Sequence, residues 1–267
     1  MYQARFNNNA STRRSVSKQR GVIMLDIIIG SVVGLIILSA AIKVYIDTIK
    51  ANAETLISSK LNQEVNAILL LVSTDVRRAG FWAADPKINT PQNDLKNNPF
   101  TEGFNDISVS AKTGEANNSC VIYSYDLNKD KVIGVDNGGL MNPPFDTAPY
   151  NNLNVEQFGF RLNNGNLEMR QGLALGDTDV GCDNGIWTRV NNNSVSISNF
   201  ELLLSAPCYK LDPLDPTPSA CVSGLPGQVI RNLEINITVS LSNNVASHKS
   251  GHTYVNIRND KFIASYP

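Results

Sequence analysis

Oxygen-bearing side chains recur at alternate positions in one stretch of the sequence. Asp126, Asn128 and Asp130 are spaced by two residues, and Asp136 follows them. This is the oxygen-ligand spacing with which a calcium-binding loop begins. The stretch departs from the EF-hand form, because two lysines lie among the acids and neither the turn glycine nor the final glutamate is present. We therefore favour a solvated turn, and a calcium site is the alternative.

Four cysteines offer a second kind of chemistry, either disulfide formation or metal binding. They are Cys120, Cys182, Cys208 and Cys221, without C-x-x-C or Cys/His metal spacing. An even number of cysteines in an oxidising compartment favours two disulfides. Three pairings are possible. We favour Cys208–Cys221, which would close a proline-rich loop, and the pair Cys120–Cys182 then follows.

Catalytic patterns are weak. His248 and His252 are four residues apart, but we expect them in a polar turn, so a helical zinc pair is not predicted. The sequence has no glycine-rich phosphate loop, G-x-S-x-G elbow or Cys–His nucleophile pattern. Its aromatic residues are not interleaved with a basic patch of the kind that nucleic acid requires. The prediction is therefore a protein that is not an enzyme, needs no cofactor and does not bind nucleic acid.

A long apolar segment precedes all of these residues. Residues 22–42 contain a single charged side chain, Asp26. At about 1.5 Å per residue, a helix of this length nearly spans a hydrocarbon core of about 30 Å. Residues 1–21 hold five of the 23 Lys and Arg side chains and none of the 24 acids, which leaves 18 bases against 24 acids, a formal charge of −6, in the remainder. The basic side should stay in the cytoplasm, and everything after the segment should face outward.

The boundary between the basic and apolar stretches carries a processing pattern. Gln19-Arg20-Gly21 lies directly before the apolar segment, and Asp26 is the fifth residue after Gly21. This resembles the prepilin signal of type IV pilins, which has a basic leader, a Gly before the cut, four apolar residues and an acid. The resemblance implies cleavage between Gly21 and Val22 by prepilin peptidase, N-methylation of Val22 and retention of the helix. Val22 stands where Phe or Met is common, and Asp26 where Glu is usual.

Asp26 has two interpretations. A lone acid near one end of a membrane helix can reach the interface without further function. Intramembrane carboxylates are nevertheless costly, by about 2.5–3.5 kcal/mol at the centre on insertion scales, so most of them mark a function. We favour a role in assembly, in which Asp26 pairs with the α-amino group of a neighbouring subunit.

A helical pattern continues beyond the apolar segment. Apolar residues recur at spacings near three and four among polar side chains, which predicts an amphipathic helix. These residues are Leu56, Leu61, Val65, Ile68, Leu69, Val72 and Val76. Gly80 fits a helix C-cap, so one helix is expected over residues 22–80. For the G-x-x-x-G pair Gly30 and Gly34, close helix packing and local weakening of the helix both remain open.

The sequence at the end of this helix makes the resemblance to the pilins more specific. Five residues fit a D-x-R-x-A-G-[FY] stretch like that of the PilW-type minor pilins: Asp75, Arg77, Ala79, Gly80 and Phe81. Residues 157–162 and 255–260 are also similar to this group, and to the J-type pseudopilins of type II secretion. The resemblance implies assembly with minor and major pilins and with an inner-membrane platform.

After residue 83 the sequence changes to short strand patterns. A weak strand is expected at 107–111. Stronger candidates are residues 120–125, 155–162, 167–171, 186–190, 195–204, 229–241 and 252–258. Asn163-Asn164-Gly165 predicts a tight hairpin. The expected fold is α+β and type IV pilin-like, with a long N-terminal helix packed on an antiparallel β-sheet head.

These patterns predict three parts and one role. Residues 1–21 form a prepilin leader, 22–80 the pilin helix with its membrane segment at 22–42, and 81–267 a periplasmic head. The expected function is that of a minor pilin, which sits in the inner membrane before assembly and in an extracellular pilus afterwards. The alternatives are a J-type pseudopilin and a membrane-anchored binding protein that never polymerises.

Overall fold

The structure is a computed structural model with two compact units, residues 1–55 and 56–267, each described here by itself. We call residues 56–267 the head unit. The described residues are 23–83, 94–129, 131–134, 153–154, 156–174, 181–212, 217 and 219–266. The chain begins with one long helix, α1, and continues with short 3₁₀ turns and antiparallel strands.

Helix α1 comprises Ile23–Val76 and therefore ends earlier than the predicted position 80. The N–H groups of Arg78 and Ala79 donate to carbonyls three residues back, which tightens the chain into turns after Val76. Gly80 has a φ of +74°, but its N–H donates to Ser124 O at 2.7 Å. The predicted role of Gly80 as the helix C-cap is thus wrong, and this glycine instead joins the helix exit to a strand.

Within the head unit, α1 buries one stripe of apolar side chains. Leu61, Val65, Ile68, Val72 and Val76 are at most 5% exposed and belong to the main hydrophobic core. Their spacing of three and four residues places them on one face of the helix, as the sequence predicts. Leu56, in contrast, is 71% exposed and lies outside this core.

The largest sheet has the strand order β1-β2-β4-β5-β3, with β6 also paired to β5. Its strands are β1 (Ser108–Ser110), β2 (Cys120–Ser124), β3 (Leu153–Asn154), β4 (Gln157–Asn163), β5 (Asn166–Ala174) and β6 (Ile186–Arg189). The hairpin predicted at Asn163-Asn164-Gly165 is confirmed. Asn163 pairs with Asn166, and both Asn164 and Gly165 adopt positive φ, as a two-residue type I′ turn requires.

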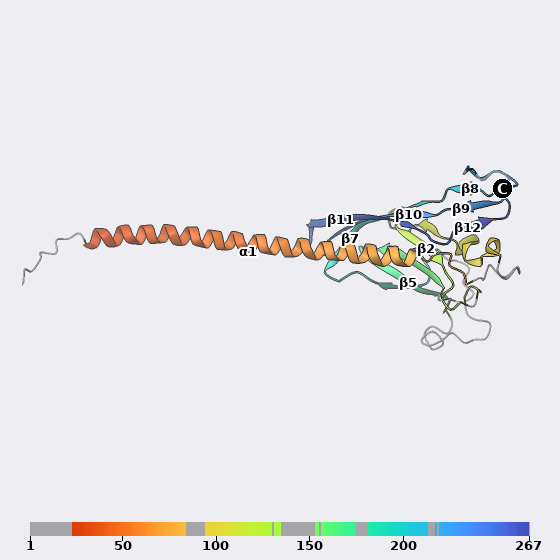
Figure 1. Cartoon of the computed structure of the whole chain (residues 1–267). Helices are drawn as coiled ribbons and strands as arrows, with labels where there is room; N and C mark the ends of the chain where they lie inside the picture. The colour runs from red at the N-terminus through yellow and green to blue at the C-terminus, as the bar shows by residue number, and fades with distance from the viewer. Residues whose placement is uncertain are drawn as a thin grey trace, which may run out of the picture. The chain divides into compact units, whose positions relative to one another are not determined.

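The second sheet has the order β11-β10-β7. It consists of β7 (Val195–Ser205), β10 (Asn232–Leu241) and β11 (Asn244–Asn256). Alternate residues of β10 from Leu233 to Val239 are at most 1% exposed, which confirms the predicted alternation. In Figure 1 these strands run beside the last turns of α1, and both contribute to one core.

The polar turn predicted around His248 and His252 is wrong. Both residues lie in β11, whose pairing with β10 continues from Asn256 to His248. An unbroken ladder of cross-strand hydrogen bonds outweighs the weak strand propensity of the Lys249–Gly251 tripeptide. The reversal lies instead between Leu241 and Asn244.

A third sheet, of order β12-β9-β8, lies at the end of the head unit that carries the C-terminus (Figure 1). Its strands are β8 (Cys208–Lys210), β9 (Gly227–Val229) and β12 (Lys261–Ile263). The 3₁₀ turns η2 (Leu95–Asn97), η3 (Pro99–Thr101) and η4 (Gly103–Asn105) precede β1. The predicted α+β class, an N-terminal helix packed on antiparallel sheets, is confirmed.

Candidate functional site

The N-terminal part of α1 is apolar and exposed. Among the described residues, α1 is the one helix that is long and apolar enough to cross a membrane, judged by length and composition. Asp26 lies in its first turn and is exposed among apolar side chains. Gly21 and Val22, where cleavage is predicted, lie outside the described residues.

Hydroxyl groups along this segment bond within the helix. Ser31 Oγ donates to Ile28 O at 2.8 Å, and Ser39 Oγ donates to Leu35 O at 2.7 Å. Such bonds satisfy a hydroxyl group where no water is available. An added Cβ at Gly30 or Gly34 would meet nothing within 4 Å, so the G-x-x-x-G face is open in this chain. These features suit a segment that lies in lipid or against other helices.

A buried carboxylate joins the end of α1 to the largest sheet. Asp75 is 7% exposed and accepts hydrogen bonds from the hydroxyls of Tyr123 and Tyr125, the latter at 3.2 Å. It also pairs with Arg78, whose guanidinium lies over the Tyr125 ring, 4.6 Å from the centroid. The Tyr125 ring stacks on Phe158 at 3.9 Å. We call Asp75, Arg78, Tyr123 and Tyr125 the junction cluster.

Both tyrosines of the junction cluster stay protonated to high pH. Burial raises the pKa of Tyr123 well above its ordinary value, and the negative charge of Asp75 raises it further. Burial and then Asp75 raise the pKa of Tyr125 as well. Each hydroxyl therefore remains a donor to the carboxylate. From the sequence, Asp75 was noted only as part of the D-x-R-x-A-G-[FY] stretch. Its role in the junction cluster could not be predicted, because its tyrosine partners lie about 50 residues further along the chain.

The acidic stretch after β2 is partly described. Asp126 is 2% exposed, and its Oδ2 accepts hydrogen bonds from the N–H groups of Ala83 at 3.0 Å and Lys131 at 3.2 Å. Glu156, fully buried, accepts hydrogen bonds from two N–H groups of the same loop. This contradicts a fully solvated turn at Asp126. Asn128 is described, whereas Asp130 and Asp136 lie outside the described residues.

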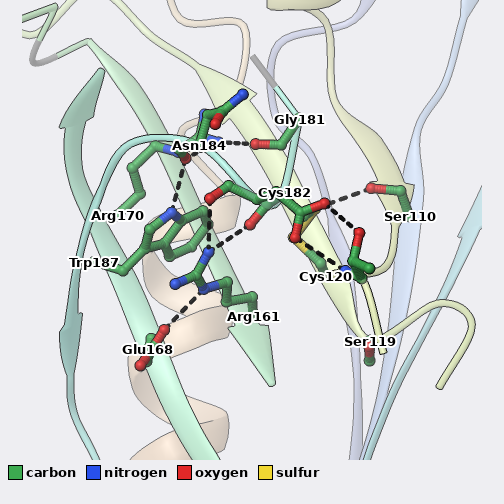
Figure 2. Close-up of a disulfide and its surroundings, with 12 residues drawn as sticks. Ser110, Ser119, Cys120, Arg161, Glu168, Arg170, Gly181, Cys182, Asn184 and Trp187 are labelled. Atoms are coloured by element: carbon green, nitrogen blue, oxygen red, sulfur yellow. Dashed lines mark hydrogen bonds and ion pairs between the residues drawn. A yellow bond between two sulfur atoms is a disulfide. The ribbon is translucent and has the colours of Figure 1, made fainter. Parts of the chain in front are cut away.

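The first disulfide, Cys120–Cys182, joins β2 to a loop whose carbonyls accept hydrogen bonds from two arginines (Figure 2). Arg161 pairs with Glu168 at 2.8 Å and donates to Cys182 O at 2.6 Å. Arg170 donates to Gly181 O and to Asn184 O.

The indole of Trp187 contacts both guanidinium groups of this loop. They lie 4.2 Å (Arg161) and 4.8 Å (Arg170) from its centroid. Such cation–π contacts add to the hydrogen bonds that fix the loop carbonyls. The arrangement supports a structural role for these side chains, because the two guanidinium groups donate to loop carbonyls and to the Glu168 carboxylate (Figure 2).

The second disulfide, Cys208–Cys221, ties β8 to the residues that follow the proline-rich loop. All four cysteines of the sequence are therefore in disulfides. These two pairings are the ones favoured from the sequence, where Cys208–Cys221 was expected to close the proline-rich loop and Cys120–Cys182 followed. Among the described residues, no group of three or more His, Cys, Asp or Glu side chains is placed to hold a metal ion. His248 and His252 lie on the exposed face of β11 and make no such group.

Loss of the first disulfide is expected to destabilise the protein more than loss of the second. In the chain-entropy model the loops of 62 and 13 residues correspond to about 4 and about 3 kcal/mol, respectively. The double variants Cys120→Ala/Cys182→Ala and Cys208→Ala/Cys221→Ala would be compared by thermal unfolding of the oxidised protein. Non-reducing peptide mapping of the wild type should find two disulfides and no free thiol. Two free thiols, or a larger loss in the Cys208/Cys221 variant, would contradict this expectation.

Comparison with known proteins agrees with these features. The family model "Prepilin peptidase-dependent protein B" matches residues 54–257. An uncharacterized protein from Haemophilus influenzae is 35% identical over 79 residues, which cover 30% of this chain and 32% of that relative's length. No solved structure shows significant similarity. Because the family model covers most of the head unit and more than half of the chain, this chain belongs to the prepilin peptidase-dependent protein B family of type IV pilus-related proteins.

Proposed function

We propose that this protein is a minor pilin of a type IV pilus, similar to the PilW group. The observation that carries the proposal is the combination of a family match over residues 54–257 with an exposed apolar helix segment that holds one acid, Asp26. A helix with these properties serves to insert in a membrane and then to pack against other apolar helices. The role is structural and not catalytic.

Processing completes the proposed subunit. Prepilin peptidase cuts between Gly21 and Val22 and removes the basic leader 1–21, and the new terminus at Val22 is N-methylated. The mature chain then consists of a pilin helix that ends at Val76 and of the head that follows it. The five basic residues of the leader support an orientation with the head in the periplasm, because basic residues flanking a membrane helix stay on the cytoplasmic side.

The partners follow from this role. They are prepilin peptidase, the other minor and major pilins, and the inner-membrane assembly platform. A head of this size repeats poorly along a whole shaft, which supports a place in initiation or at the tip of the filament. The subunit would pass from the inner membrane to an extracellular pilus on assembly.

A J-type pseudopilin of a type II secretion system is the second candidate. It is supported by the same helix and by the residues 157–162 and 255–260, which resemble both groups. A membrane-anchored binding protein that never polymerises is a third, and it would retain its leader. Genes for a pilus or for a secretion system beside the coding sequence would separate the first two.

Intact-mass analysis and N-terminal sequencing of the membrane-extracted protein test the proposal. We expect a mature chain that begins with methylated Val22, because the cleavage pattern places Gly21 before the cut. Expression in cells that lack prepilin peptidase is the matched control and should give the uncut chain. A protein that keeps residues 1–21 in cells with active peptidase would contradict the proposed function.

A further inference from the structure

One carboxylate oxygen in the head unit is buried without a partner. Asp126 is 2% exposed, and its Oδ1 has no hydrogen-bond partner. Buried polar atoms are nearly always bonded to protein, water or an ion, and a carboxylate oxygen without a partner is costly. Asp126 Oδ1 therefore needs a ligand that supplies positive charge or a donor.

The hydrogen bonds of Oδ2, the second oxygen of the Asp126 carboxylate, show where this carboxylate lies. Asp126 Oδ2 accepts the N–H of Lys131, five residues further along, and the N–H of Ala83. These two bonds hold the carboxylate between its own loop and the residues that follow α1. We call residues 126–129 and 131–134 the Asp126 loop. Oδ1 of the same carboxylate therefore lies beside the Asp126 loop and is shielded from solvent.

A second buried carboxylate is held by the same loop. Glu156 is 0% exposed, with Oε1 accepting the N–H of Leu127 and Oε2 the N–H of Gly134, both at 2.9 Å. Backbone N–H groups orient both carboxylates. Each carboxylate oxygen has two lone pairs, so an oxygen that accepts one N–H can still bind a cation.

We propose that Asp126 and Glu156 are the carboxylate ligands of a calcium site beside the Asp126 loop. The buried Asp126 carboxylate favours a divalent cation over a water molecule at Oδ1, because a cation also offsets the cost of burying its charge. The site differs from the pattern of alternate acids in the sequence, since Glu156 comes from the residue preceding β4 and not from that pattern.

Calcium fits the donor set better than other metals do. The ligands are oxygens, the head cysteines are in disulfides, and both histidines lie on β11. Zinc and copper prefer the nitrogen and sulfur ligands that are missing from the described part of this loop. Calcium accepts carboxylates together with backbone carbonyls in flexible geometry, as a loop provides.

The bound ion would reinforce the exit of α1. The N–H of Asp126 donates to Phe81 O, and Ala83 donates to its carboxylate, so the loop is attached to the residues that follow the helix. Trp82 also donates from Nε1 to Lys131 O at 3.2 Å. Calcium would therefore stabilise the connection between the helix and the largest sheet.

Calcium titration of the full-length chain in detergent, after EDTA treatment and removal of the chelator, tests the site. We expect one calcium ion per chain by calorimetry and a rise of several degrees in the melting temperature. Asp126→Asn and Glu156→Gln should each weaken calcium binding by about ten-fold or more. Asp106→Asn is the control, because Asp106 pairs with Arg231 and Lys261 outside the loop. It should lower the melting temperature but keep the affinity for calcium.

Terbium luminescence locates the site without changing a ligand. Terbium(III) takes the same oxygen ligands, and energy transfer from a nearby indole excites its emission. Trp82→Phe should remove most of this emission, and Trp187→Phe should leave it. Wild-type protein without saturable calcium binding, wild-type affinity in Asp126→Asn, or emission that depends on Trp187 and not on Trp82 would each overturn the proposal.

Discussion

Asp26→Ala is expected to remove the subunit from sheared filaments while cleavage and the stability of the head unit persist. In the proposed mature chain the terminus at Val22 would carry a positive amine, and a neighbouring Asp26 carboxylate would neutralise it in an apolar filament core. Breaking a buried ion pair by removing one partner costs about 3–5 kcal/mol. Asp26 belongs to the unit 1–55, whereas the hydrophobic core lies in the unit 56–267, so folding of the head should not depend on it.

Asp26→Glu and Asp47→Ala are the matched controls for this experiment. Asp26→Glu keeps the charge and restores the acid that is usual in pilins, so incorporation should be normal. Asp47 lies in the same part of α1 and is exposed. Asp47→Ala therefore tests whether the loss of any acid in this part of the helix reduces incorporation into filaments. Processing, melting of the head and the amount of subunit in sheared filaments would be measured for each. Normal incorporation of Asp26→Ala would show that this carboxylate is not the assembly contact.

Local patterns in the sequence predicted much of the fold. The alternation in β10 and the Asn164-Gly165 turn are properties of neighbouring residues, and both are present in the structure. The main stripe of α1 was predicted for the same reason. Leu56 continues the periodicity but is 71% exposed, because burial depends on what lies opposite a residue and not only on its spacing.

The remaining elements depend on partners that are distant in sequence. The strands β8, β9 and β12 have three residues each and pair across long separations, so they carry little periodic signal. The histidines lie in a strand because β10 provides a continuous partner. Glu156 was missed at the Asp126 loop, since only the fold brings it to the Leu127 and Gly134 N–H groups.

A different carboxylate should matter most for the folding of the head unit. Asp75→Ala leaves the hydroxyls of Tyr123 and Tyr125 buried without their acceptor, and these residues are 2% and 4% exposed. An unsatisfied buried donor costs about 1–3 kcal/mol, so we expect a loss of about 2–6 kcal/mol in the free energy of unfolding. Arg78 adds little, because its side chain is 54% exposed and can turn to water.

The junction cluster also sets an alkaline limit to stability. The pKa of Tyr123 and of Tyr125 is raised in the folded state by burial and by Asp75. A free tyrosine titrates near about pH 10, so the unfolded chain loses these protons first as the pH rises. The contribution of both tyrosines is therefore complete below about pH 10 and declines above it. Denaturant unfolding between neutral pH and pH 11 should show this decline, and a Tyr123→Phe/Tyr125→Phe variant should show less of it.

A double-mutant comparison separates the lost acceptor from other effects of Asp75→Ala. Removing both hydroxyls in Tyr123→Phe/Tyr125→Phe deletes the donors, so adding Asp75→Ala to that background should cost clearly less than in the wild type. Asp75→Asn keeps one acceptor oxygen and should fall between wild type and Asp75→Ala. Chemical denaturation gives all these free energies. If Asp75→Ala costs the same with and without the two hydroxyls, Asp75 does not stabilise the junction by accepting their hydrogen bonds, and the packing of α1 on β2 must rest on its apolar stripe alone.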